Sequence, residues 1–205
     1  MKKFIPLIAA AMALVSLCAC ARRLPPVPEA GAGGVVIRFD YQKQSGHASN
    51  QFAVWIEDAS GNLVKTLYAT RYTANGGYKN RPDSIPLWVE KSGLAGMSGP
   101  EVDAVAGATP KSGTLEFAWD LTGREGKPVA PGTYWAYVEG SLRWKNRVLY
   151  SQAFAVDGLP HTFAAAAEYF YEGTEAQPAL TSGSPENAMI GPVTVRIAGS
   201  DPIYE

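Results

Sequence analysis

Two alternating segments joined by a long connection constrain the fold of this chain most. Thr114–Trp119 alternates polar and apolar side chains, which predicts a strand with one face against a core. Thr133–Glu139 is rich in Tyr and Trp, residues that strands favour. Glycines and prolines recur between the two segments and prevent continued regular pairing there. We therefore predict a β-hairpin with a long loop.

Short strand-like segments also occur along the rest of the chain. They are Val35–Tyr41, Gln51–Asp58, Leu63–Tyr72, Arg147–Val156, Thr162–Tyr171 and Val193–Ala198. The turn between the second and third predicts a hairpin. Tyr78–Pro100 has no regular pattern, and Leu87–Lys91 within it is open between one helical turn and a short strand. Many short strands without alternating helices predict an all-β fold, a single Ig-like antiparallel β-sandwich.

Residues 1–19 have the pattern of an export signal. Lys2 and Lys3 precede Phe4–Leu17, an apolar stretch too short to span a bilayer. The following Leu-Cys-Ala-Cys resembles a bacterial lipobox, which implies that Cys20 is lipidated. Ordinary secretory cleavage near Ala19 or Ala21 is the alternative.

Lipidation at Cys20 would have consequences for the mature chain. It would hold no free thiol, so the fold must be stable without a disulfide. Residues 20–34, rich in Pro and then Gly, would form a flexible tether from the lipid bilayer to a domain at 35–205. Ala21 in place of Asp, by resemblance to Gram-negative sorting, favours the outer membrane over the inner one. We therefore predict a lipid-anchored periplasmic protein.

Composition disfavours several kinds of function. Without Lys2 and Lys3 the chain has 16 basic against 19 acidic residues, so no nucleic-acid surface is expected. The only histidines are His47 and His161, which disfavours a His/Cys metal site. No G-x-S-x-G motif supports a Ser–His–Asp hydrolase.

Two sets of side chains have a structural and a functional interpretation. The carboxylate pairs Glu57–Asp58 and Glu101–Asp103 are expected to be solvated. Four aromatic residues form either a stacking patch for a flavin or sugar or, preferably, part of the core. They are Trp135, Tyr137, Trp144 and Tyr150.

The segments 56–67 and 117–134 resemble the Ig-like domain of the flagellar hook-capping protein and of secreted C-terminal sorting modules. The match rests on Trp119-Asp120 and on Val129–Tyr134, whereas Leu121 replaces the usual Gly. The resemblance implies that Trp119 fills the core, that Asp120 caps a turn, and that Gly132–Tyr134 begins the next strand. It concerns the fold alone.

Three further motifs are similar to those of a family of predicted bacterial periplasmic proteins of unknown function. They are A-V-W-I-E-D at 53–58, R-P-D-S-I-P-L-W at 81–88 and D-A-V-A-G-A-T at 103–109. The likeness extends over about Val35–Asp157. Members of this family are often encoded near flavin transferases and membrane redox proteins with peptidase-inhibitor-like propeptide domains, which implies a link to extracytoplasmic electron transfer.

Asp103–Ser112 also resembles the flavinylation motif of covalent-FMN domains, D-x-x-(S/T)-G-A-T-x-x-(S/T). The resemblance implies that a flavin transferase joins FMN through its phosphate to the hydroxyl of Thr109. Asp103 would present the loop or hold the Mg²⁺ of the FAD donor. Gly107 and Ala108 would let the transferase approach the backbone closely.

A structural interpretation of this loop stays open, because Ala106 stands where Ser or Thr is usual and Pro110 follows Thr109 directly. Asp103 would then cap a turn and the small residues would pack against the hairpin. The functional hypothesis is an accessory to flavin-linked electron transfer, not an enzyme by itself, whose partners are a flavin transferase and a membrane redox protein. The alternative is a non-catalytic binding or scaffolding lipoprotein of the cell envelope.

Overall fold

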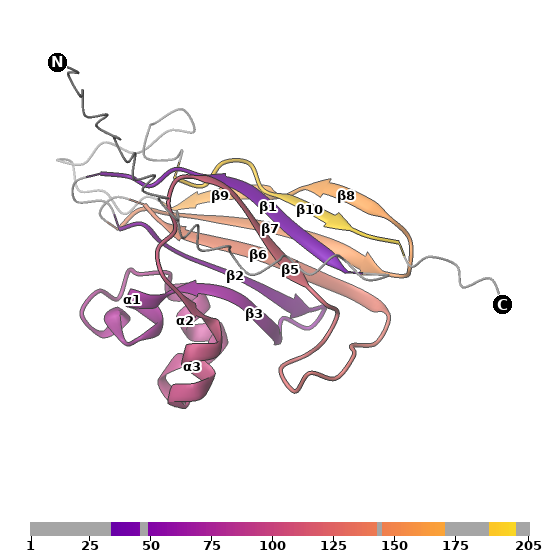
Figure 1. The fold of residues 1–205 in the computed structure, drawn as a ribbon, viewed down its shortest axis with the longest axis horizontal. Coiled ribbons are helices and arrows are strands. Elements are labelled where there is room, and N and C mark those ends of the chain that lie inside the picture. Colours follow the sequence, from indigo (N-terminus) through magenta and orange to yellow (C-terminus); the bar gives the residue numbers. More distant parts are fainter. Residues whose placement is uncertain (1–33, 46–48, 143–144, 171–188, 200–205) are drawn as a thin grey trace, which may run out of the picture.

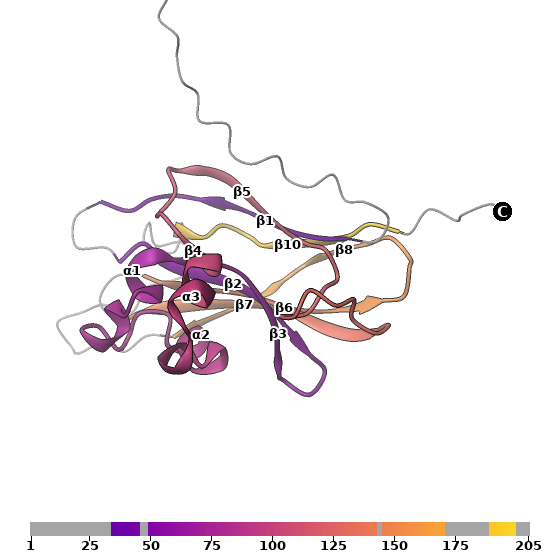
Figure 2. The ribbon, with the colours of Figure 1, turned by 60° about the horizontal axis from the view of Figure 1, so that its bottom comes forward.

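The computed structural model describes residues 34–45, 49–142, 145–170 and 189–199. Two stacked sheets form a β-sandwich, and three short helices lie on the outer side of one sheet (Figures 1 and 2). The four-stranded sheet has the order β5-β1-β10-β8, and the six-stranded sheet has the order β4-β3-β2-β6-β7-β9. The predicted all-β sandwich is confirmed. The signal peptide, Cys20 and the tether lie outside the described residues.

The four-stranded sheet contains β1 (Val35–Tyr41), β5 (Gly113–Trp119), β8 (His161–Ala164) and β10 (Thr194–Ile197). The six-stranded sheet contains β2 (Gln51–Asp58), β3 (Leu63–Thr70), β4 (Ala106–Gly107), β6 (Gly132–Ser141), β7 (Arg147–Val156) and β9 (Ala166–Phe170). The strand pairs are antiparallel except for β3 with β4, which is parallel. The predicted hairpin of β2 and β3 is confirmed.

The main core lies between the two sheets and follows from the alternation in the strands. In β1, Val35, Ile37 and Phe39 are buried, whereas Arg38 and Asp40 are exposed. Their counterparts across the sandwich come from the inward-facing residues of β2, β6 and β7. Burying these apolar faces against each other stabilises the sandwich without a cross-link.

The predicted hairpin between residues 114–119 and 133–139 is wrong. β5 pairs with β1 and β6 pairs with β2 and β7, so residues 120–131 cross from one sheet to the other. The alternation of polar and apolar side chains shows which face of a strand is buried, but it does not show which strand lies beside it. Asp120 caps a turn, as expected, because it accepts the backbone N–H of Thr122 at 3.1 Å. The Tyr134 hydroxyl donates to the Ala130 carbonyl at 2.6 Å.

The segment predicted as one strand over 162–171 is two strands in different sheets. β8 pairs with β10 in the four-stranded sheet, and β9 pairs with β7 in the six-stranded sheet. Ala165, between them, donates its N–H to the carbonyl of Val193 at 2.9 Å. A run of small alanines therefore carries the chain from one layer to the other.

Residues 71–105 form the helical layer, which the sequence pattern did not resolve. It contains α1 (Arg71–Ala74), α2 (Pro86–Ser92), α3 (Gly99–Val105) and the 3₁₀ turns η1 (Gly77–Lys79) and η2 (Leu94–Gly96). Leu87–Lys91 is helical, and the strand predicted to Tyr72 ends at Thr70. Trp88 of α2 is fully buried in a second core, against Trp55 and Ala69 of the sheet. Among the described residues, no helix is long and apolar enough to cross a membrane.

Candidate functional site

Asp103 lies within α3 and not at a turn. The N-terminus of α3 is capped by Ser98 and Glu101, whose carboxylate accepts the Ser98 backbone N–H at 2.8 Å. Asp103 is exposed, and its carboxylate has no hydrogen bond or ion pair within the described residues. The expectation that Asp103 caps a turn is therefore wrong.

Gly107 has a packing role that the structure makes plain. Ala106 and Gly107 form β4, which pairs with Ala69 and Thr70 at the end of β3. A Cβ atom on Gly107 would overlap the ring of Tyr68. The Tyr68 hydroxyl donates to the Ala108 carbonyl at 2.7 Å, which holds the motif against β3. Gly107 therefore packs closely against β3, and not against the hairpin that the structural interpretation named.

Ala108 and Thr109 begin the connection from β4 to β5. Ala108 is exposed and Thr109 is half-buried, and the Thr109 hydroxyl has no partner within the described residues. Further along the connection, Ser112 accepts the backbone N–H of Lys43 at 3.0 Å. Packing therefore explains Gly107, but not the residue types at Asp103 and Thr109.

The motif lies at one end of the sandwich, opposite the point where the chain enters it. Gly113, which follows the motif, is opposite Tyr41 at the end of β1, whereas Val35 at the start of β1 is opposite Trp119. Figure 1 shows this connection climbing from α3 to β5 at the left, while β1 begins at the right. A strand of this length separates the two ends by about 20 Å.

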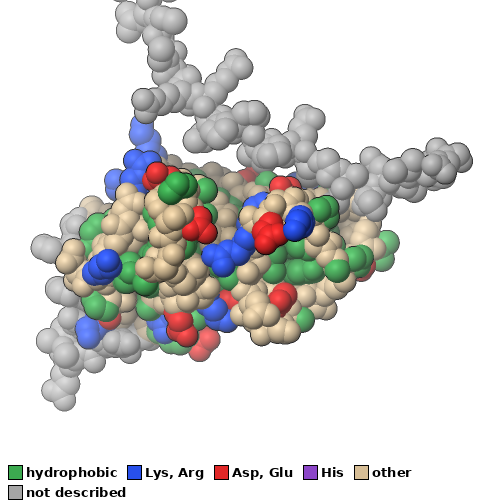
Figure 3. All heavy atoms as spheres, turned by 90° about the horizontal axis from the view of Figure 1, so that it is seen from below, with side chains coloured by type: hydrophobic (Ala, Val, Ile, Leu, Met, Phe, Trp, Pro, Cys, Tyr) green, Lys and Arg blue, Asp and Glu red, His purple; other side chains and the backbone are tan. Residues whose placement is uncertain are grey.

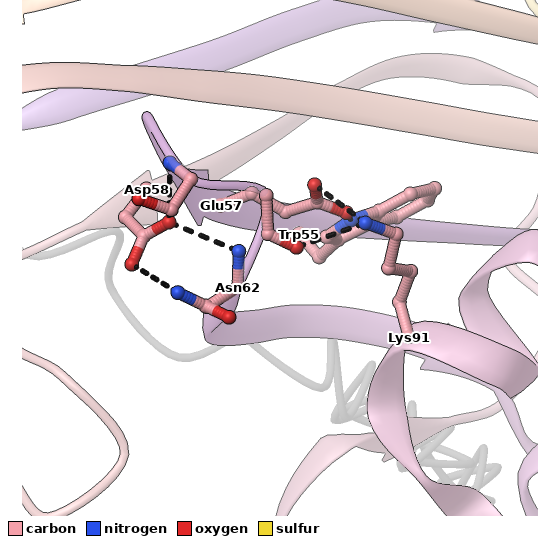
Figure 4. Close-up of polar contacts among 7 residues, drawn as sticks. Trp55, Glu57, Asp58, Asn62 and Lys91 are labelled. Atoms are coloured by element: carbon pink, nitrogen blue, oxygen red, sulfur yellow. Dashed lines mark hydrogen bonds and ion pairs between the residues drawn. The ribbon is translucent and has the colours of Figure 1, made fainter.

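Glu57 is not solvated, contrary to expectation. Its side chain accepts hydrogen bonds from Trp55 Nε1 at 2.8 Å and from Lys91 Nζ at 3.1 Å, and the residue is only 3% exposed (Figure 4). Asp58 instead caps the β2–β3 turn, and its hydrogen bonds to the Asn62 side chain and backbone hold its pKa below the ordinary value. Within this pair, Glu57 therefore has a buried structural role, whereas Asp58 caps a turn.

Glu139 is a buried carboxylate that the sequence analysis missed. Its oxygens accept the backbone N–H groups of Leu87 at 3.3 Å and Trp88 at 2.9 Å, and Arg147 Nη1 lies at 3.1 Å. The residue is fully buried, and burial raises the pKa of its carboxyl. From the sequence alone, Glu139 looks like a surface residue near the end of a strand. Its burial becomes evident only from the helix that packs over it.

The raised pKa of Glu139 predicts a pH dependence of stability. Between the ordinary Glu pKa and the raised value, the folded chain binds a proton that the unfolded chain has lost, so this group's contribution to stability falls as pH rises through that window. Glu139→Gln removes this titration. We expect the stability of wild type relative to Glu139→Gln to decrease from about pH 4 upward and then level off. Urea unfolding at a series of pH values checks it, and a pH-independent difference would contradict it.

The predicted aromatic set is divided between the core and the surface. Tyr150 is buried in the main core. Trp55, Tyr137 and Trp135 form a ladder of nearly parallel rings, with centroid distances of 5.1 Å and 6.1 Å. The ladder runs from fully buried Trp55 to partly exposed Trp135 on the helix side of the sheet. Trp144 lies outside the described residues.

The remaining candidate metal ligands are the acidic and histidine side chains of the described residues. Within the described residues, no group of three or more His, Cys, Asp or Glu side chains is placed to hold a metal ion. His161 lies 3.5 Å from Asp157 in an exposed pair. His47 and Cys20 lie outside the described part of the chain.

These features define a β-sandwich module with a helical layer on one sheet and a surface motif at one end. A family model described as "Predicted periplasmic protein (DUF2271)" matches residues 35–172, more than half of the chain. The chain therefore belongs to this family of predicted periplasmic proteins. Comparisons with curated proteins and with solved structures find no match.

Proposed function

We propose that this chain is a lipid-anchored periplasmic accessory to flavin-linked electron transfer, which carries FMN covalently on Thr109. The observation that supports it is that the fold requires one residue of the motif for packing but makes no use of two others. Gly107 is required by the ring of Tyr68, whereas the carboxylate of Asp103 and the hydroxyl of Thr109 have no partner within the described residues. Side chains that have no hydrogen-bonding partner in the fold are the ones that a modifying enzyme would recognise.

The chemistry of attachment needs only the threonine hydroxyl from this chain. Its oxygen would attack the phosphorus on the FMN side of the FAD pyrophosphate, forming the Thr109 Oγ–P bond and releasing AMP. The hydroxyl proton would pass to a base of the transferase. Asp103, exposed on α3, would be the acidic recognition residue. The bound flavin would supply the electron-transfer chemistry, and the sandwich would position it.

The position of the motif bears on how such a carrier would work. With the tether entering at Val35, Thr109 lies at the opposite end of the sandwich. A flavin there would face away from the anchor attachment, where a redox partner reaches it without the bilayer in the way. The acyl chain on Cys20 would keep the module near the membrane surface.

We expect the full chain, co-expressed in the periplasm with a flavin transferase, to gain about 438 Da, one FMN less water. Thr109→Ala should abolish this gain and the in-gel flavin fluorescence. The matched control is Thr162→Ala, an exposed threonine of β8, which should load like wild type. Intact mass spectrometry measures all three. Unmodified wild type beside a transferase that is active on a control substrate would overturn the proposal.

The second candidate is a non-catalytic binding or scaffolding lipoprotein. The ring ladder that ends at partly exposed Trp135 favours it, because a stacked aromatic edge offers a ready platform for a planar or sugar ligand. The mass measurement separates the two candidates: a flavin carrier gains the FMN mass, whereas a scaffold does not.

A further inference from the structure

The basic residues of the described part of the chain divide into paired and unpaired ones. Arg38, Lys65, Lys91, Lys127 and Arg147 form ion pairs with carboxylates. Arg124 donates to the Ser92 carbonyl, and Lys79 lies over the Tyr78 ring. In this part of the chain, four cationic groups have no ion pair, hydrogen bond or ring contact; they are Lys43, Arg71, Lys111 and Arg196.

Arg71 lies beside the motif. It follows Thr70, the residue opposite Gly107 in the parallel pair of β3 and β4, and it begins α1, which contacts β4. Burial raises the pKa of Tyr68, the nearby Tyr41 adds to this, and the Arg71 guanidinium opposes it. The Tyr68 hydroxyl in turn donates to the Ala108 carbonyl. Arg71 thus follows the strand end that pairs with Gly107, close to the backbone that precedes Thr109.

Lys111 and Lys43 lie at the connection that follows Thr109. Lys111 is exposed and follows Thr109 by two positions. Lys43 is exposed, and its backbone N–H donates to Ser112 at 3.0 Å, which places it beside the same connection. Arg71, Lys43 and Lys111 thus lie in or next to the connection 108–112, and we call them the cationic cluster.

Few carboxylates offset the cationic cluster. Residues 104–112 contain no acidic residue. Asp40, near the end of β1, accepts the Thr114 hydroxyl at 2.6 Å, and Asp103 lies on α3. Figure 3 shows Lys and Arg side chains at the upper left with an Asp or Glu side chain beside them, and Lys and Arg interspersed with Asp and Glu over the rest of that face. Like charges left together without partners on a folded surface indicate an anionic ligand.

We propose that the cationic cluster is a phosphate-binding site that receives the phosphate of a flavin mononucleotide beside Thr109. The inference rests on the proposed function for the identity of the ligand. Arg71 offers the planar donor fork that suits phosphate oxygens, and the two lysines add mobile positive charge. Such a site would hold the phosphodiester that joins FMN to Thr109.

The test uses free ligand and the purified, unmodified full chain, so it does not depend on covalent loading. FMN and riboflavin, which lacks the phosphate, are titrated and flavin fluorescence quenching is followed. We expect FMN to bind about tenfold more tightly than riboflavin at low salt, a preference that falls with added salt. Arg71→Gln with Lys111→Gln should abolish the preference, whereas Arg196→Gln should keep it.

Two outcomes would overturn the phosphate site: equal or undetectable binding of the two flavins by wild type, or an unchanged FMN preference in the double variant. Failure of covalent loading with FMN preference intact would contradict the proposed function and leave the phosphate site standing. Covalent loading without an FMN preference would contradict the phosphate site and leave the proposed function standing.

Discussion

Glu139→Ala should lower the free energy of unfolding by about 3–5 kcal/mol. The substitution leaves the guanidinium of Arg147 without its carboxylate and leaves the backbone N–H groups of Leu87 and Trp88 without an acceptor. The N–H groups belong to the first turn of α2, which covers the fully buried Glu139, so water cannot readily replace the lost oxygens there. Urea unfolding followed by tryptophan fluorescence measures the loss.

The matched control is Glu116→Ala, which also removes the glutamate of an Arg–Glu pair on a strand. Its partner Arg38 lies at 3.7 Å, and both side chains are well exposed, at 61% for Arg38 and 40% for Glu116. Such pairs contribute about 1 kcal/mol or less. Equal losses in the two variants would show that burial of Glu139 does not determine its role.

Trp119→Ala should cost a similar amount, about 3–5 kcal/mol. Trp119 is 1% exposed at the end of β5, and its ring meets those of Tyr134 and Phe154 edge-on at 5.3 Å and 6.2 Å. Its Nε1 also donates to the Thr122 carbonyl at 2.8 Å. The variant would thus leave a cavity in the core and release the start of the connection between the sheets.

Two further variants separate these contributions. Trp119→Phe keeps most of the apolar contact and loses the indole hydrogen bond, so we expect an intermediate loss. Trp135→Ala removes a tryptophan that is partly exposed on the helix side of the sheet, and it should cost clearly less than Trp119→Ala. Calorimetric or urea unfolding ranks the three. A larger loss at Trp135 would contradict the assignment of Trp119 to the main core.

For the candidate site, the sequence located the motif but not the task of each residue in it. The resemblance singled out Asp103, Gly107, Ala108 and Thr109 together. Only the structure separates Gly107, which the fold needs for its packing against Tyr68, from Asp103 and Thr109, whose side chains have no partner within the described residues. Arg71 joins the site through the β3–β4 pairing, a contact between residues 37 positions apart that no local pattern signals.

Local pattern was sufficient for most strands. Short strand-like segments predicted β1, β2, β5 and β7 at close to their observed bounds, and alternation in β5 indicated its buried face, because a half-buried strand needs one apolar face. Turn residues predicted the hairpin of β2 and β3 for the same local reason. The sequence by itself thus determined the fold class.

Only the tertiary structure decided how those strands are partnered and which polar groups are buried. β5 and β6 are consecutive, yet they lie in different sheets, since a strand's partner depends on long-range packing and not on its own alternation. Glu57 and Glu139 look like surface residues in sequence. They are buried because the helical layer brings Lys91 and the backbone N–H groups of α2 over them, and an interior carboxylate requires such partners.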